Sequence, residues 1–294
     1  MSDYIIATSS TCDLPAEWLE SHGVPFIRYT FTINDRVLED DCRDETRAEL
    51  FQAMRDGDLL KTSMINEYSY QEFFRQLMES GKDVIYLDMA EKISVSYQNS
   101  LRAAEAVREE FPERKLYVMD TRCISGGLGF LVAHSVRMAE AGAGFDEVIA
   151  WGESNKLKIA HRFTVDDLKY LSRSGRVSNA SALIGSVLNI KPVLYVPDAG
   201  TLDVAVKCRG RKKALQTILN GIRSDWSGVD AKGREMLILH ADCQADAEFV
   251  KAEVEKMFPD AGEVRISSLG VVIGAHVGPG LLAAFYLCDS RTPG

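Results

Sequence analysis

Short strand-type runs alternate with helical patterns along most of this 294-residue chain, and this alternation limits its fold more than any other feature. In the first half, strand-type runs lie at residues 4–8, 24–29, 83–88 and 115–120, and apolar residues follow helical spacing at 15–22, 46–55, 68–80 and 96–110. Strands that alternate with helices are typical of α/β proteins with a largely parallel sheet. We therefore expect a doubly wound, mainly parallel α/β sheet in the first half.

The second half begins a new series of strands after two helical patterns at residues 128–141 and 147–158. Strand-type runs follow at 159–163, 193–196, 204–208, 235–240, 263–267 and 283–288, with helical patterns at 211–224 and 245–257. Turn residues at 197–200 separate two of these runs, which predicts an antiparallel pair and a mixed sheet. Since about 150 residues make a typical domain, we expect two α/β domains, at residues 1–159 and 160–294.

The amino-acid composition limits the classes of partner that the chain is expected to bind. The chain is 46% apolar and 26% charged, as globular proteins are, and its formal charge is −9. Such an acidic chain lacks the clustered Lys and Arg that hold a phosphate backbone, so nucleic acid is not an expected partner. The six cysteines are scattered without a C-x-x-C pair, which indicates free thiols in a reducing compartment. With no signal peptide and no apolar span of about 18 residues, the sequence predicts a cytoplasmic protein without a transmembrane segment.

Four hydroxyl-rich segments follow predicted strands or precede predicted helices, where backbone N–H groups are unpaired. They are Ser9-Ser10-Thr11, Lys61-Thr62-Ser63, Ser94-Val95-Ser96 and Ser125-Gly126-Gly127. Ser and Thr commonly cap helices at such places, and the same N–H groups also suit an anion. Because the two roles can coexist, these segments are candidates for an anion site.

A polar imidazole lies inside a glycine-rich and otherwise apolar stretch, Gly274-Ala275-His276-Val277-Gly278-Pro279-Gly280. Glycine allows the backbone to come close to a ligand, which makes His276 a candidate binding residue. A lone His among apolar residues is more often a core residue, and that alternative stays open at this point. His240, directly after a predicted strand, gives a similar but weaker signal.

Three more segments are interpreted from their spacing and charge. Residues 125–129 lack the G-x-G-x-x-G spacing of a dinucleotide site, which favours a tight turn with close helix–sheet packing. Arg173 and Arg176 form a basic turn that could bind phosphate or carboxylate, or could pair with neighbouring acids. The basic cluster at 207–213, which contains Arg209, could dock a negatively charged partner or could simply begin an exposed helix.

Taken in order, several segments resemble the DegV family of bacterial fatty-acid-binding proteins, the lipid-carrying subunits of fatty acid kinase. The resemblance covers nearly the whole chain, and its strength lies in the order of the motifs. The matching segments are residues 8–15, 61–63, 120–121, 125–129, 168–171, 173–178, 189–192, 207–210, 212–215 and 276–280.

The resemblance implies two α/β domains with a fatty acid buried between them. It implies that Thr62, Ser94 and His276 bind the carboxylate, and Ser63 and Ser96 complete this predicted site. The sequence departs from the family pattern at two loops. The usual Ser-Gly-Thr is Ser94-Val95-Ser96, and the Pro that commonly follows Lys-Thr-Ser is absent from residues 64–66. These departures concern the geometry of the two loops.

The same resemblance links the basic turn to the kinase subunit, so we predict Arg173, Arg176 and Arg209 to be kinase-docking or phosphate-facing residues. We expect the protein to bind a long-chain fatty acid in a buried tunnel and to present its carboxylate for acyl-phosphate formation. On this interpretation the chain is a carrier and not an enzyme, and it needs no metal and no cofactor. Transient contact with a membrane surface would serve lipid exchange.

Two other functions are open to a chain of this kind. It could be an enzyme in which His276 acts as base or nucleophile toward a small carbonyl or acyl substrate, with Ser94 or Ser96 supplying a hydroxyl. It could instead be a scaffold without a small ligand, which would leave the hydroxyl-rich segments unexplained. The sequence does not fix the acyl chain length, the oligomeric state or the identity of the kinase.

Overall fold

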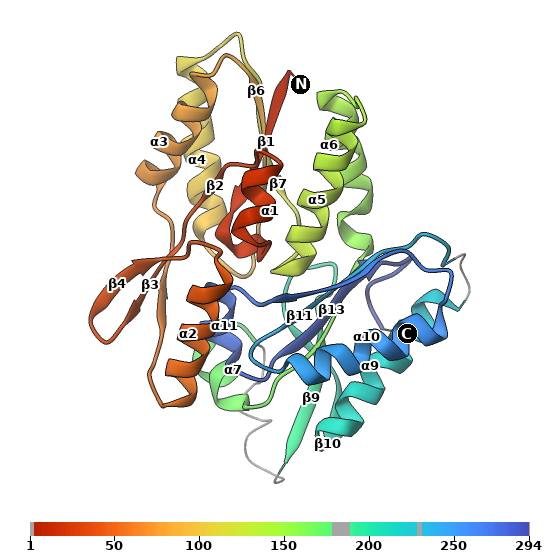
Figure 1. Cartoon of the computed structure of the whole chain (residues 1–294). Helices are drawn as coiled ribbons and strands as arrows, with labels where there is room; N and C mark the ends of the chain where they lie inside the picture. The colour runs from red at the N-terminus through yellow and green to blue at the C-terminus, as the bar shows by residue number, and fades with distance from the viewer. Residues whose placement is uncertain (1–2, 178–188, 228–230, 294) are drawn as a thin grey trace.

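The computed structural model of the chain describes residues 3–177, 189–227 and 231–293. A four-stranded sheet forms from the first half of the chain. Its strands are β2 (Phe26–Ile27), β1 (Tyr4–Ser9), β6 (Asp83–Asp88) and β7 (Leu116–Asp120), in that order, and every neighbouring pair is parallel. Figure 1 shows α3 (Glu67–Met78) and α4 (Ser96–Glu110) on one side of these strands, and α5 (Gly126–Glu140) and α6 (Phe145–Asn155) on the other. The prediction of a doubly wound parallel sheet is confirmed.

A six-stranded sheet forms from the second half. Its order is β10 (Asp203–Arg209), β9 (Ile190–Tyr195), β8 (Ile159–Thr164), β13 (Leu282–Leu287), β11 (Met236–His240) and β12 (Val264–Ser268). Every pair is antiparallel except β11 with β12, so the predicted mixed sheet is confirmed. Helices α9 (Arg211–Trp226) and α10 (Gln244–Met257) pack against it.

Helix α5 contacts both sheets, since it packs against β1 and β6 of the first and against β8, β11 and β13 of the second. Its first turn lies very close to the six-stranded sheet. A Cβ atom on Gly126 would come within 2.6 Å of the Phe285 ring, and one on Gly127 within 2.1 Å of His161 Nε2. The glycines at residues 125–129 therefore serve close helix–sheet packing, as the spacing predicted.

A small antiparallel sheet was not predicted. It consists of β4 (Arg36–Glu39), β3 (Thr30–Ile33) and β5 (Lys61–Ser63), and it lies beside α2 (Asp44–Arg55). The sequence placed residues 61–63 in a loop, and this was wrong because the strand depends on pairing with Thr30–Thr32, which are distant in sequence. The run predicted at 24–29 is likewise shorter, and only Phe26 and Ile27 form strand.

The glycine-rich stretch around His276 contains a short helix, α11 (Val271–Val277), that the sequence did not predict. Gly274 costs helix stability, but a Cβ atom there would lie 2.6 Å from the Phe51 ring, so only glycine allows α11 to approach α2 this closely. After the helix, Gly278 and Gly280 have φ of +80° and +87°, a region that favours glycine. The chain thus turns directly from α11 into β13.

One large apolar core runs from the parallel sheet to the inner face of the six-stranded sheet, and a second lies between that sheet and helices α9 and α10. The division of the chain at residue 160 stays a prediction. All six cysteines are free thiols, as expected. Within the described residues, no helix combines the length and apolar character that crossing a bilayer requires.

Candidate functional site

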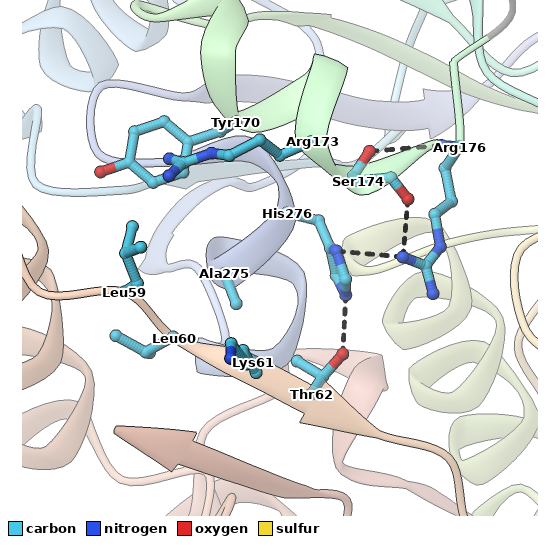
Figure 2. Close-up of a pocket in the computed structure, with 10 residues that line it drawn as sticks. All are labelled: Leu59, Leu60, Lys61, Thr62, Tyr170, Arg173, Ser174, Arg176, Ala275 and His276. Carbon is cyan, nitrogen blue, oxygen red and sulfur yellow. Dashed lines mark hydrogen bonds between the residues drawn. The ribbon is translucent and has the colours of Figure 1, made fainter. Parts of the chain in front are cut away.

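Two adjoining cavities lie where β5, α11 and the end of α7 (Leu168–Ser174) meet. The cation-rich cavity, of about 340 Å³, is drawn in Figure 2 with its lining residues Leu59, Leu60, Lys61, Thr62, Tyr170, Arg173, Ser174, Arg176, Ala275 and His276. The hydroxyl-rich cavity, of about 190 Å³, is lined by Tyr29, Thr62, Ser63, Ser94 and His276 together with apolar side chains. Four residues line both cavities: Thr62, Ser174, Arg176 and His276.

The wall between the cavities is a direct contact between the two halves of the chain. Thr62 Oγ1, on β5, lies 2.8 Å from His276 Nε2, near the end of α11 (Figure 2). These residues are 214 positions apart in sequence. The structure therefore brings together two residues that sequence motifs placed in one carboxylate site.

The partners of His276 indicate which ring nitrogen carries the proton. Arg176 Nη1 lies 3.5 Å from His276 Nδ1, and because a guanidinium can only donate, Nδ1 is the accepting nitrogen. Nε2 then carries the hydrogen and donates it to Thr62 Oγ1, which leaves the Thr62 hydroxyl free to donate to a ligand. Burial, and then the Arg176 charge, lower the pKa of His276 to about 4, so the imidazole is neutral at pH 7.

The serine-rich segment reaches the hydroxyl-rich cavity through Ser94, whereas Ser96 is fully buried behind it. Ser94 Oγ lies 3.0 Å from Ser96 Oγ and accepts a hydrogen bond from Ser96 N. Ser96 Oγ in turn accepts from the Ile65 backbone N–H at 3.1 Å. Of the predicted carboxylate-binding residues, Thr62, Ser63, Ser94 and His276 line this cavity, and Ser96 supports it.

Positive charge surrounds the cation-rich cavity. Lys61, Arg173 and Arg176 all line it, and none of them forms an ion pair within 4.0 Å among the described residues. The Arg173 guanidinium lies 4.8 Å from the centre of the Tyr170 ring, a cation–π contact that orients it. Pairing with Asp166 or Asp167, an alternative that the sequence left open, is therefore absent. Arg209, on β10, lines neither cavity.

An apolar void of about 40 Å³ lies next to the hydroxyl-rich cavity. The two share Ile124, Leu202, Ile273 and Val277, whose side chains form the wall between them. Of the apolar residues near His276 in sequence, Val272, Ile273 and Leu281 line one or both spaces. Val271 and Leu282 instead belong to separate cores.

A second polar cluster, called here the Asp13–Arg47 cluster, lies at the opposite end of α11. The Arg47 side chain is fully buried and donates to Ser268 O at 2.9 Å and to Leu14 O at 3.1 Å. Ser125 Oγ donates to Asp13 Oδ2, and Asp13 Oδ1 faces Gly270, the residue before α11. Burial raises the pKa of Asp13 to about 7, although Arg47 and Ser125 oppose this shift. Sequence patterns did not single out Asp13 or Arg47.

Sequence reasoning also missed Tyr29, which lines the hydroxyl-rich cavity. The sequence predicts it as the last residue of a strand, but it lies between β2 and β3. His240, the weaker His candidate, lies at the end of β11 and lines neither cavity; its Nδ1 accepts from Cys243 N at 3.4 Å.

Comparison with known proteins gives consistent results along the chain. Residues 4–289 match a family of uncharacterised proteins, the DegV family. The DegV domain-containing protein CPE0026 of Clostridium perfringens is 34% identical over 294 residues, with all of both chains covered.

Solved structures extend the match to three dimensions. A fatty-acid-binding DegV family protein from Thermus thermophilus is 29% identical, with a TM-score of 0.86 that covers 97% of this chain and 99% of that one. A stearic acid-binding protein from Eubacterium ventriosum is 25% identical, with a TM-score of 0.85 and coverage of 97% and 98%.

Proposed function

The chain belongs to the DegV family, and from that premise we propose that it binds a long-chain fatty acid, with the carboxylate in the hydroxyl-rich cavity. The fatty-acid-binding relatives of known structure support this ligand class. We further propose that the chain is a carrier that presents the carboxylate to a partner kinase for acyl-phosphate formation.

The observation that carries the proposal is the contact of Thr62 with His276 beside an apolar wall. An ionised carboxylate is costly to bury unless donors pair with it. Here the Thr62 hydroxyl is free to donate, Ser63 and Ser94 line the same space, and Arg176 adds a positive charge. This arrangement suits a single carboxylate at one end of an apolar ligand.

The tail would supply most of the binding free energy. At about 0.8 kcal/mol per methylene, about fourteen methylenes give on the order of 11 kcal/mol before ordering costs. The tail would run from the hydroxyl-rich cavity toward the apolar void. Since Ile124, Leu202, Ile273 and Val277 separate these spaces, a long tail requires those side chains to move apart.

Presentation to a kinase is supported by the three unpaired cations beside the carboxylate site. A carboxylate carries one negative charge, whereas the phosphoryl group that a kinase would add carries more. Lys61, Arg173 and Arg176 surround the adjoining cavity, where such a group would lie. Arg173 and Arg176 thus remain proposed kinase-docking or phosphate-facing residues, and Arg209 a proposed docking residue on the β9–β10 hairpin.

The geometry gives less support to an enzyme that uses His276 as base or nucleophile. In a hydrolytic Ser-His-Asp arrangement, an acid accepts a hydrogen bond from the histidine and stabilises its charged form. At His276 the corresponding nitrogen faces the guanidinium of Arg176, which disfavours a positive imidazole.

Native mass spectrometry of the purified protein tests the carrier function. A carrier should retain a bound mass in the fatty-acid range, and denaturation should release it. If ligand-free protein also failed to bind added stearic acid, the proposed function would be wrong.

The docking role is tested with Arg173→Ala. This change should leave stearic acid binding unchanged and should lower the rate at which the cognate kinase phosphorylates the bound lipid. Arg223→Ala, which removes a charge that lines neither cavity, is the matched control. A loss of bound lipid in Arg173→Ala would place Arg173 in the lipid site instead.

A further inference from the structure

Tyr29 has a buried hydroxyl that forms no hydrogen bond of normal geometry with any described residue. The residue is 3% exposed, and its Oη makes no hydrogen bond. Eight other buried side-chain N or O atoms also lack a hydrogen-bond partner within the described chain, and none of them belongs to a residue that lines the hydroxyl-rich cavity. A buried hydroxyl without a partner costs stability, so this one calls for a physical explanation.

The backbone fixes where the Tyr29 side chain lies. Tyr29 N donates to Ser10 Oγ at 3.1 Å, and Tyr29 O accepts from Asp40 N at 2.8 Å. The next residue, Thr30, pairs with Ser63 across β3 and β5. Held in this way, Tyr29 lines the hydroxyl-rich cavity together with Thr62, Ser63 and Ser94.

The surroundings of the hydroxyl leave it as a proton donor. Burial, and then the nearby Asp88, raise the pKa of Tyr29 well above its ordinary value, so the group stays protonated. The hydroxyls of Ser94, Ser96 and Tyr70 lie close enough to favour its ionised form slightly, but none makes a hydrogen bond of normal geometry with it. Ser94 and Ser96 instead bond to each other.

We propose that Tyr29 is a further ligand-binding residue whose hydroxyl donates a hydrogen bond to the carboxylate of the bound fatty acid. The inference rests on the proposed function, since it assumes a carboxylate between Tyr29, Thr62 and Ser94. The ligand carboxylate is then the hydrogen-bond acceptor that the Tyr29 hydroxyl lacks within the protein.

Tyr29→Phe tests the inference because it removes the hydroxyl and keeps the ring. Affinity for stearic acid, measured by titration of ligand-free protein, should fall about ten- to a hundred-fold, as expected for a hydrogen bond to a charged group. The ligand-free variant should melt at the same temperature as the unchanged protein or higher, because the orphan hydroxyl is gone. A structural role for this hydroxyl predicts the reverse, with lower melting temperature and unchanged affinity.

Tyr70→Phe is the matched control. Tyr70 is also fully buried, but its hydroxyl accepts from Tyr86 at 3.4 Å and it lines neither cavity. This variant should lose some stability and keep its affinity for stearic acid. Similar loss of affinity in both variants would overturn the inference, since it would indicate a general effect of tyrosine removal.

A second ligand distinguishes a contact of Tyr29 with the head group from a contact with the tail. Octadecanol has the same chain length without the carboxylate, so Tyr29→Phe should weaken its binding much less than that of stearic acid. Equal losses for the two ligands would show that Tyr29 packs on the tail, and the inference would be wrong. If the unchanged protein bound neither ligand, the proposed function itself would fail, whereas equal stearic acid binding by protein and variant would overturn only the role of Tyr29.

Discussion

The two ends of α11 contact polar clusters that differ in how their hydrogen-bonding groups are used. At the start of the helix, buried Arg47 donates to two backbone carbonyls, and Asp13 accepts from Ser125. At the other end, His276 contacts Thr62, whose hydroxyl is free to donate, and none of the three nearby cations forms an ion pair among the described residues. The first cluster therefore suits a structural role that joins neighbouring segments, and the second fits the carboxylate site that we propose.

This difference predicts that mutations in the two clusters separate stability from binding. The Asp13–Arg47 cluster should control stability, and the Thr62–His276 contact should control affinity for fatty acid. Three experiments test this separation, in order of decreasing expected effect.

Arg47→Ala should have the largest effect, a loss of about 3–5 kcal/mol in the free energy of unfolding, because it leaves buried polar groups without their partner. Urea denaturation followed by circular dichroism measures this loss. Arg43→Ala, which removes an exposed ion-pairing arginine four residues earlier, should cost at most about 1 kcal/mol. Equal losses of unfolding free energy in the two variants would contradict a stabilising role for the buried Arg47 that surface ion pairs do not have.

Asp13→Asn should change how stability depends on pH. The folded-state pKa of Asp13 is raised to about 7, above its unfolded value. Between about pH 4 and pH 7 the folded protein therefore keeps a proton on Asp13 that the unfolded protein has lost. The contribution of Asp13 to the free energy of unfolding thus falls as pH rises through this range. The variant should therefore lose less stability than the unchanged protein between pH 5 and pH 8. Urea denaturation at both pH values gives this difference directly, and other titrating groups cancel in the comparison. Parallel curves for the two proteins would contradict the raised pKa.

Thr62→Ala and His276→Ala should have the smallest effect on stability and a clear effect on binding. Both remove part of the proposed carboxylate site, so stearic acid affinity should fall about ten-fold, or about 1.4 kcal/mol, while unfolding free energy changes by less than about 1 kcal/mol. Titration with stearic acid and urea denaturation measure the two quantities. Undiminished binding in both variants would refute this head-group site.

The fold could be predicted from sequence wherever local pattern decides it. The buried runs that became β1, β6 and β7 are continuous and apolar, and the turn at 197–200 marks the β9–β10 hairpin. Strand β5 could not be found in this way, because three polar residues carry no alternation and pair with a distant strand. Helix α11 was missed because Gly274 argues against a helix until its packing against Phe51 is known.

The candidate site shows the same limit. Motif order pointed to Thr62 and His276, and the structure places them in contact. Tyr29 gave no signal because its importance lies in a missing hydrogen-bond partner, which no sequence pattern records. The unpaired state of Arg173 was equally invisible, since acidic residues lie close to it in sequence and yet do not pair with it in space.

Helix α5, whose glycine turn fits against one sheet while its body packs on the other, has a consequence for how a guest could be exchanged. Separating the two sheets would remove α5 from one of them and would expose the apolar faces of both sheets to water. We therefore expect a ligand to enter and leave through movement of the short segments around the pocket, such as β5 and α11. This movement costs less free energy than separating the two sheets, which stay in place.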